Sequence, residues 1–77
     1  MEDKHIIRHI EDLVHEEEHL YGKDLLSNEE ITRLHLIKTE LDQYWDLLRQ
    51  RRGKREAGDD PSEAKLRPKD IVENYRQ

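Results

Sequence analysis

The placement of the aliphatic residues is the strongest constraint on the fold of this chain. Of its 18 leucine, isoleucine and valine residues, 15 lie in the first 48 positions, and 33 of the 77 residues are charged. A chain of this length supports one small domain at most, which excludes the large multi-layered enzyme folds. So few apolar side chains can form a core only if they share one face of each element, and their spacing indicates that they do.

The first expected helix covers about residues 3–21. Its main apolar stripe has intervals of four, three and seven residues, which are typical of an amphipathic helix, and a second row lies beside it. The stripe consists of Ile6, Ile10, Leu13 and Leu20, and the second row of Ile7, Val14 and Tyr21. Asp3 is a suitable N-cap, and Gly22 is a suitable stop.

The second expected helix covers about residues 28–52. It starts with the strongest local signal in the chain, because Ser27 and Glu30 have the spacing of a capping box. Gly53 is the first residue expected to break the helix. Its apolar face is expected to comprise Ile31, Leu34, Ile37, Leu41, Tyr44, Trp45 and Leu48.

The short connection between the helices predicts an antiparallel hairpin. Pairing residues outward from the loop places Asp3 beside Trp45, so the second helix is expected to project past the first by about two turns. Trp45 and Leu48 then need another cover, and Leu36 and Leu47 project from the far flank of the same helix. A two-helix hairpin is too small to bury all of these side chains. The sequence therefore predicts an all-α homodimer, a four-helix bundle made of two hairpins.

The remaining residues are expected to belong to the same single domain, 1–77, with a hairpin at 1–52 and a tail at 53–77. A short helical turn is expected near residue 61, where a proline follows an aspartate. The tail has few apolar residues of its own. It is expected to dock on the region of Trp45 and Leu48 through the side chains of Ile71, Val72 and Tyr75.

Several segments carry a resemblance to a known family. Residues 44–52 (YWDLLRQRR), 55–58 (REAG), 60–61 (DP) and 65–68 (KLRP) look like those of short bacterial proteins catalogued as domain of unknown function 2630. The acidic stretch at 15–19 (HEEEH) is similar too. The resemblance covers nearly the whole chain and implies a small cytoplasmic helical protein whose tail belongs to the domain. It implies no assigned activity and no catalytic residues.

Histidines at helical spacing raise the question of a metal site. His15 and His19 match the zinc-protease pattern H-E-x-x-H and share one side of a helix, and His5 and His9 have the same spacing. Catalysis also needs a third ligand and a substrate cleft, and the chain has no cysteine to supply a thiolate. Because His15 and His19 lie opposite the apolar stripe, a solvated acidic face is favoured. We expect no catalytic, cofactor or metal site.

Two charged residues interrupt the apolar stripes. Glu17 lies between Leu13 and Leu20 in the sequence, and Lys38 lies between Leu34 and Leu41. A buried charge without a partner would cost several kcal/mol. The expected register of the hairpin keeps the two apart within one chain. They are therefore expected either to pair across a dimer and set its register, or to extend to solvent at the rim of the bundle.

A basic cluster with a net charge of +5 occupies residues 49–55. It consists of Arg49, Arg51, Arg52, Lys54 and Arg55. Such a cluster could bind phosphates. The favoured alternative is structural, because cations at a helix C-terminus complement its dipole and can pair with the acids that follow. The net charge of −7 in residues 1–30 also repels polyanions, so only weak binding to nucleic acid is expected.

The expected function is that of a non-enzymatic helical protein, a homodimer that acts as an interaction or regulatory module and binds another protein. Two alternatives stay open. One is a weak nucleic-acid-associated factor that uses the basic cluster, and the other is a metal-binding or metal-dependent enzyme centred on His15 and His19. The start of the chain lacks the pattern of a secretion signal, and no apolar run approaches the ~20 residues of a membrane span. A cytoplasmic location is expected.

Overall fold

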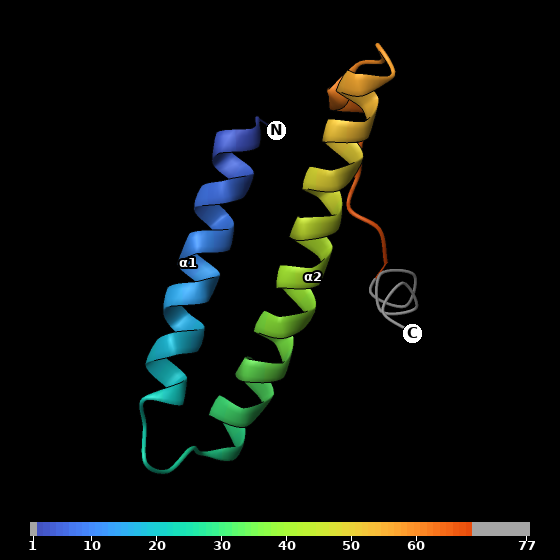
Figure 1. Cartoon of the computed structure of the whole chain (residues 1–77). Coiled ribbons are helices and arrows are strands. Elements are labelled where there is room, and N and C mark those ends of the chain that lie inside the picture. The colour runs from blue at the N-terminus through green and yellow to red at the C-terminus, as the bar shows by residue number, and fades with distance from the viewer. Residues whose placement is uncertain (1, 69–77) are drawn as a thin grey trace.

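The computed structural model describes residues 2–68, which form an antiparallel helical hairpin followed by a short return along its second helix (Figure 1). Helix α1 spans Asp3–Tyr21, helix α2 spans Asn28–Glu56, and a single 3-10 turn, η1, spans Pro61–Glu63. The described residues contain no strand. The predicted all-α hairpin is confirmed, and α2 is four residues longer than expected.

The core is a single seam between α1 and α2. In its loop half, Leu13 and Leu20 of α1 pack with Leu34 and Ile37 of α2. In its open half, the partners are Ile6, Ile10 and Leu47. The predicted α1 stripe is confirmed, because Ile6, Ile10, Leu13 and Leu20 are all buried.

The predicted register between the helices is wrong. Leu20 packs on Leu34, and the carboxylate of Asp3 contacts Arg51 and Arg55 where a contact with Trp45 was expected. The connecting loop extends beyond the end of α1 before α2 begins (Figure 1). Helix α2 therefore starts further from the open end of the hairpin than the pairing of residues outward from the loop assumes. Helix α2 runs five residues past Arg51 to Glu56, so it still extends beyond the start of α1 at the open end of the hairpin (Figure 1).

The shift in register changes which side chains of α2 face inward. The inner stripe runs through Leu41 and Tyr44 to Leu47, whose side chain is 6% exposed, whereas Trp45 is 51% exposed. Leu48 is partly buried at the edge of the same cluster. The expectation that Leu36 and Leu47 share an outer flank is therefore wrong, because Leu47 belongs to the core of its own hairpin.

The two helix starts are stabilised differently. At α2 the predicted capping box is confirmed, with Ser27 Oγ accepting from the Glu30 amide at 3.1 Å and Glu30 Oε1 accepting from the Ser27 amide at 2.9 Å. At α1 the N-cap is Glu2, which makes no side-chain cap bond. Asp3 is the first helical residue, and the expectation that it caps the helix is wrong. Its carboxylate instead forms ion pairs with Arg51 and Arg55 of α2.

Gly53 does not end α2, because a glycine inside a helix is only mildly unfavourable and its neighbours continue the helical hydrogen bonds. The helix ends at the C-cap Ala57, and the following Gly58 has φ of 82°, the left-handed conformation that favours glycine.

We expect Gly53→Ala to raise the free energy of unfolding by about 0.5–1 kcal/mol, because alanine loses less backbone entropy in a helix. Apart from its chain neighbours and the backbone of its own helix, a Cβ atom at Gly53 would meet no atom within 4 Å. Gly58→Ala is the matched control and should be destabilising, because it forces alanine to a positive φ. Urea denaturation followed by circular dichroism measures both, and a loss of stability for Gly53→Ala would contradict the expectation.

The described part of the tail turns back and runs along α2. As predicted, a turn starts at Asp60, whose Oδ1 accepts from the Ser62 amide at 3.0 Å. Ala64 then packs against the open half of the core. Gln50 Nε2 donates to the Lys65 carbonyl at 2.8 Å, holding the tail to the helix.

Further along, Gln43 Nε2 donates to the carbonyl of Arg67 at 3.1 Å, and the Arg67 side chain pairs with buried Asp46 at 3.2 Å. These contacts are polar and lie on the Gln43–Asp46 side of α2. The predicted docking through Ile71, Val72 and Tyr75 concerns residues outside the described range. The division into a hairpin and a docked tail stays a prediction.

Candidate functional site

Two members of the basic cluster hold the start of α1 against the end of α2. Arg51 Nε donates to Asp3 Oδ1 and an Arg55 NH2 group donates to Asp3 Oδ2, each at 2.5 Å. Arg51 also donates to the Pro61 carbonyl at 3.2 Å, so one side chain joins α1, α2 and the tail. Hydrogen bonds from Arg55 and Arg51 lower the pKa of Asp3 to about 2.

The other members of the basic cluster are spread around the helix. Lys54 lies 3.8 Å from Glu63 of the tail turn. Within residues 2–68, Arg49 and Arg52 make no ion pair, and Arg49 lines an open hollow of about 190 Å³ beside Arg67. Three of the five cations are thus engaged inside the chain. This arrangement favours the structural interpretation of the cluster, and weak binding to nucleic acid stays an untested prediction.

The histidines of the zinc-protease pattern lie on the outer side of α1. Both His15 and His19 are exposed. In the described part of the chain, no three histidine, aspartate or glutamate side chains come together in a way that could hold a metal ion. Metal binding through this pair therefore has no support from the geometry of these residues.

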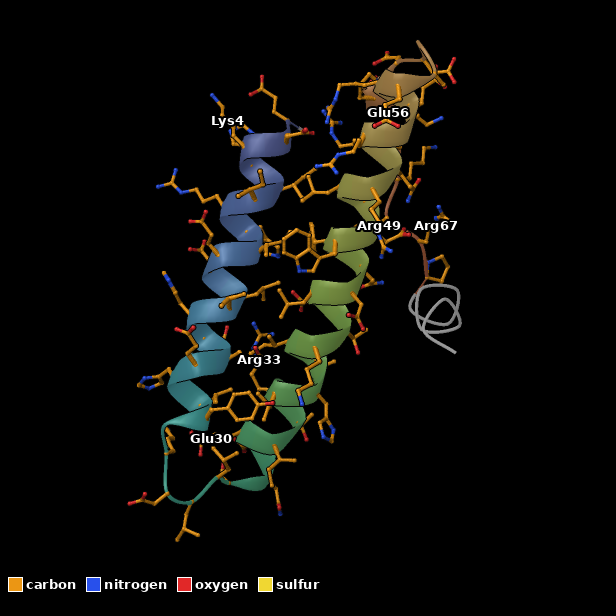
Figure 2. All side chains as sticks on the ribbon, in the orientation of Figure 1. Lys4, Glu30, Arg33, Arg49, Glu56 and Arg67 are labelled. Atoms are coloured by element: carbon orange, nitrogen blue, oxygen red, sulfur yellow. The ribbon has the colours of Figure 1, made fainter. Side chains whose placement is uncertain are left out.

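Polar side chains of α1 and α2 contact one another along one flank of the hairpin. The Arg33 guanidinium makes two hydrogen bonds to the carboxylate of Glu16, at 2.6 and 2.8 Å, and lies between the helices (Figure 2). The bond from Arg33 lowers the pKa of Glu16. Nearer the open end of the hairpin, His9 Nε2 lies 3.7 Å from Glu40 Oε2. The centres of the His9 and Tyr44 rings are 4.4 Å apart. Glu16 and His9 of α1 therefore take part in the contact between the two helices.

The opposite flank presents an unpaired surface that we call the heptad face. It is built from two rows with seven-residue intervals, one on each helix: Ile7, Val14 and Tyr21 on α1, and Ile31, Lys38, Trp45 and Arg52 on α2. Residues seven apart share one side of a helix. The Lys38 ammonium lies 5.5 Å from the centre of the Tyr21 ring, which shows that the two rows lie on the same side of the hairpin.

The heptad face exposes large apolar side chains. The exposed fractions are 44% for Ile7, 57% for Tyr21, 42% for Ile31 and 51% for Trp45. Single exposed apolar residues are ordinary, but these four lie on one side of two adjacent helices.

Lys38 is the charged residue in the middle of this face. The adjacent Tyr21 side chain raises the pKa of Lys38, and the charge of Glu17 adds to the effect. Glu17 and Lys38 form no ion pair with each other within the described part of one chain, so their pairing across a dimer or extension to solvent stays a prediction. Neither charge is buried alone, because Lys38 is exposed and Glu17 is partly so.

Comparison with known proteins gives a family without an assigned activity. The family model described as Protein of unknown function (DUF2630) matches residues 2–77. The chain belongs to this family. It is 48% identical over 77 residues to uncharacterized proteins of Mycobacterium bovis and of Mycobacterium tuberculosis strain ATCC 25618 / H37Rv, an alignment that covers 95% of this chain and 88% of each relative. No solved structure matches the chain.

Sequence reasoning on this DUF2630 chain overlooked residues that act between elements. Arg33, Gln43 and Gln50 were not singled out, although they join α2 to α1 or to the tail. A signal for Arg33 was present, because it lies one heptad before Glu40 on the same side of α2.

Neither α1 nor α2 contains a stretch long and apolar enough to cross a membrane, a finding limited to residues 2–68.

Proposed function

We propose that this chain is a non-enzymatic interaction module that works as a homodimer, with the heptad faces of two hairpins packed together in a four-helix bundle. The observation that carries the proposal is the pair of half-exposed rows on adjacent helices. Apolar side chains at seven-residue intervals are the pattern by which helices of separate chains pack against one another. Pairing two such hairpins produces the up-and-down arrangement of a four-helix bundle.

The small core supports the same proposal. Within residues 2–68, seven apolar side chains are buried, and they form one seam between two helices. A seam of this size offers little to offset the entropy of ordering the chain. A second copy on the heptad face would bury Ile7 and Trp45 and place a second apolar layer over the seam.

The use of the basic cluster also favours an interaction module over a nucleic-acid factor. Arg51 and Arg55 are committed to Asp3, and Lys54 lies close to Glu63. Cations already paired with carboxylates attract phosphates less strongly, because the net charge of each pair is close to zero at a distance. The flanks outside the heptad face are left for a partner protein.

Sedimentation equilibrium of the full chain at micromolar concentration tests the homodimer. We expect twice the chain mass for the natural protein and a monomer for Trp45→Glu, which places a charge in the apolar contact. Leu36→Glu is the matched control. Leu36 is 52% exposed, as Trp45 is 51% exposed, but nine residues of helix place it on the opposite side of α2.

Leu36→Glu should therefore remain a dimer. A cooperatively folded monomer in the natural protein would overturn the proposal. So would dissociation by Leu36→Glu with Trp45→Glu unaffected, because the contact would then lie on the other flank.

A further inference from the structure

We infer that the second copy packs on the open half of the heptad face, around Ile7 and Trp45, with its hairpin reversed, so that the two loops lie at opposite ends and each helix meets its own counterpart. In this arrangement Lys4 of one chain lies against Glu11 of the other, and Asp42 lies against Arg49. The inference rests on the proposed homodimer and adds its geometry, for which the charges beside the heptad face are the argument.

Each row of the heptad face has a charged row on its outer side, again at seven-residue intervals. On α1 the charged row is Lys4, Glu11 and Glu18, and on α2 it is His35, Asp42, Arg49 and Glu56. Figure 2 shows Lys4 and Arg49 on opposite outer sides of the hairpin. Charges in these positions of helical bundles decide which helices pair and in which direction.

The contacts between α1 and α2 show which charged residues lie at the same level. Asp3 contacts Arg51 at the open end, so Lys4 is level with Arg49. His9 packs on Tyr44 further down, so Glu11 is level with Asp42. At each of these two levels, the outer positions of α1 and α2 carry the same sign of charge.

A twofold axis parallel to the helices would join like charges. It places α1 on α2 of the second copy with equal levels together. Lys4 would then face Arg49 of the second copy, and Glu11 would face Asp42. Like charges placed opposite one another across an interface oppose association, so this arrangement is disfavoured.

A twofold axis perpendicular to the helices instead places opposite charges together at both of these levels. It turns each helix against its own counterpart in the reverse direction. The midpoint between Lys4 and Glu11 lies beside Ile7, and the midpoint between Asp42 and Arg49 lies beside Trp45. These midpoints share a level, because Ile6 and Ile10 on α1 pack on Leu47.

One axis can therefore form the Lys4–Glu11 and Asp42–Arg49 pairs together. It also places Ile7 and Trp45, which are 44% and 51% exposed, at the centre of the contact. Large apolar anchors at the centre with charges at the rim are the usual anatomy of an interface. On α2 the same axis brings His35 towards Glu56 of the second copy, and it brings Lys38 towards Arg52, because these two residues lie seven positions before and after Trp45. This single like-charge contact opposes association, whereas the parallel arrangement has like charges at both of the levels compared.

The α1 pair is the better one to test. Asp42 takes part in another contact of its own chain, whereas Glu11 is exposed on the outer side of α1. Lys4 lies 3.6 Å from Glu2 in its own chain, but both side chains are largely exposed, so that ion pair is weak. Lys4→Glu also puts an acid in the first turn of a helix, which the helix dipole favours, so the variant should fold.

The experiment measures the dimer dissociation constant of Lys4→Glu, Glu11→Lys and the double variant by sedimentation equilibrium at low salt. We expect each single variant to weaken the dimer by about tenfold, because the twofold axis repeats each repulsion. The double variant should return to within about threefold of the natural protein, because it restores both pairs with their signs exchanged.

Arg8→Glu and Asp12→Lys are matched controls, since they make the same charge changes on exposed positions of α1 outside the charged row. They should alter the constant by less than about threefold. Tighter dimers from both single variants would overturn the inference in favour of the parallel arrangement, and so would a double variant no better than the singles. In either case the homodimer itself would stand. A natural protein that is monomeric would remove the homodimer and the inference together.

Discussion

Leu47→Ala should lower the free energy of unfolding by about 3 kcal/mol, whereas Leu36→Ala should change it by less than about 1 kcal/mol. Both variants remove the same atoms from the same helix. Leu47 is 6% exposed and packs with Ile6 and Ile10, so its truncation leaves a cavity in the open half of the core. Leu36 is 52% exposed, so its truncation leaves none.

The size of the expected loss is large for a chain with one seam of core. Domains of this kind have a total stability of only about 5–15 kcal/mol, so Leu47→Ala should also lower the melting temperature by more than about 10 °C. Urea and thermal unfolding followed by circular dichroism measure both changes, at one fixed protein concentration because dimers gain stability by mass action. Equal losses for the two variants would mean that Leu47 is not in the core.

The contrast between the two helices explains how far the fold could be predicted from sequence. In α1 the four core residues belong to one stripe, and local periodicity was enough to find them. Around the surface of α2, Trp45 and Leu47 lie on opposite sides of Tyr44. Either of them can continue a helical stripe that runs through Leu41. The choice between them depends on the register across the hairpin.

That register depends on the conformation of the connecting loop, which the apolar pattern does not report. The loop sets α2 lower than a direct count assumes, and Asp3 then meets Arg51. Local signals were reliable where the contact itself was local. The capping box of Ser27 and Glu30 and the turn at Asp60 each join residues at most three positions apart, and both were predicted correctly.

The candidate site shows the same limit. The basic cluster could be found from composition, and the acids just after it were expected to be its partners. Lys54 does approach Glu63 of the tail, but Arg51 and Arg55 pair with Asp3, about fifty residues earlier in the chain. The sequence suggested that Asp3 is an N-cap, because capping involves only neighbouring residues. The ion pair across the hairpin could be predicted only if the register of the two helices were known.

Asp3→Asn should lower the free energy of unfolding by about 1–2 kcal/mol at neutral pH, and most of this difference should disappear by about pH 2. The hydrogen bonds of Arg55 and Arg51 lower the pKa of Asp3 from 3.8 to about 2. The full shift would correspond to about 2.5 kcal/mol, and solvent screening of this partly exposed group reduces it. The Arg51 side chain, which is 11% exposed, loses its charged partner in the variant.

The direction of the pH dependence follows from the lowered pKa. Above the unfolded value of 3.8, Asp3 is ionised in both states, and its pairing with Arg51 and Arg55 stabilises the fold in full. As the pH falls from about 4 to about 2, the unfolded chain takes up the proton first, and the contribution of Asp3 is lost. The asparagine side chain of the variant does not titrate, so the difference between the two proteins isolates this carboxyl from Glu16 and Glu30, whose pKa values are also lowered.

Urea denaturation of both proteins from about pH 7 to about pH 2 measures that difference, with Asp12→Asn, an exposed position of α1, as the control that should show none. A difference that persists unchanged at the lowest pH would assign the loss to packing and not to charge. Added salt should reduce the difference at neutral pH, because the Arg55 side of the cluster is open to solvent. The ion pair would then be established as the contact that holds the start of α1 to the end of α2.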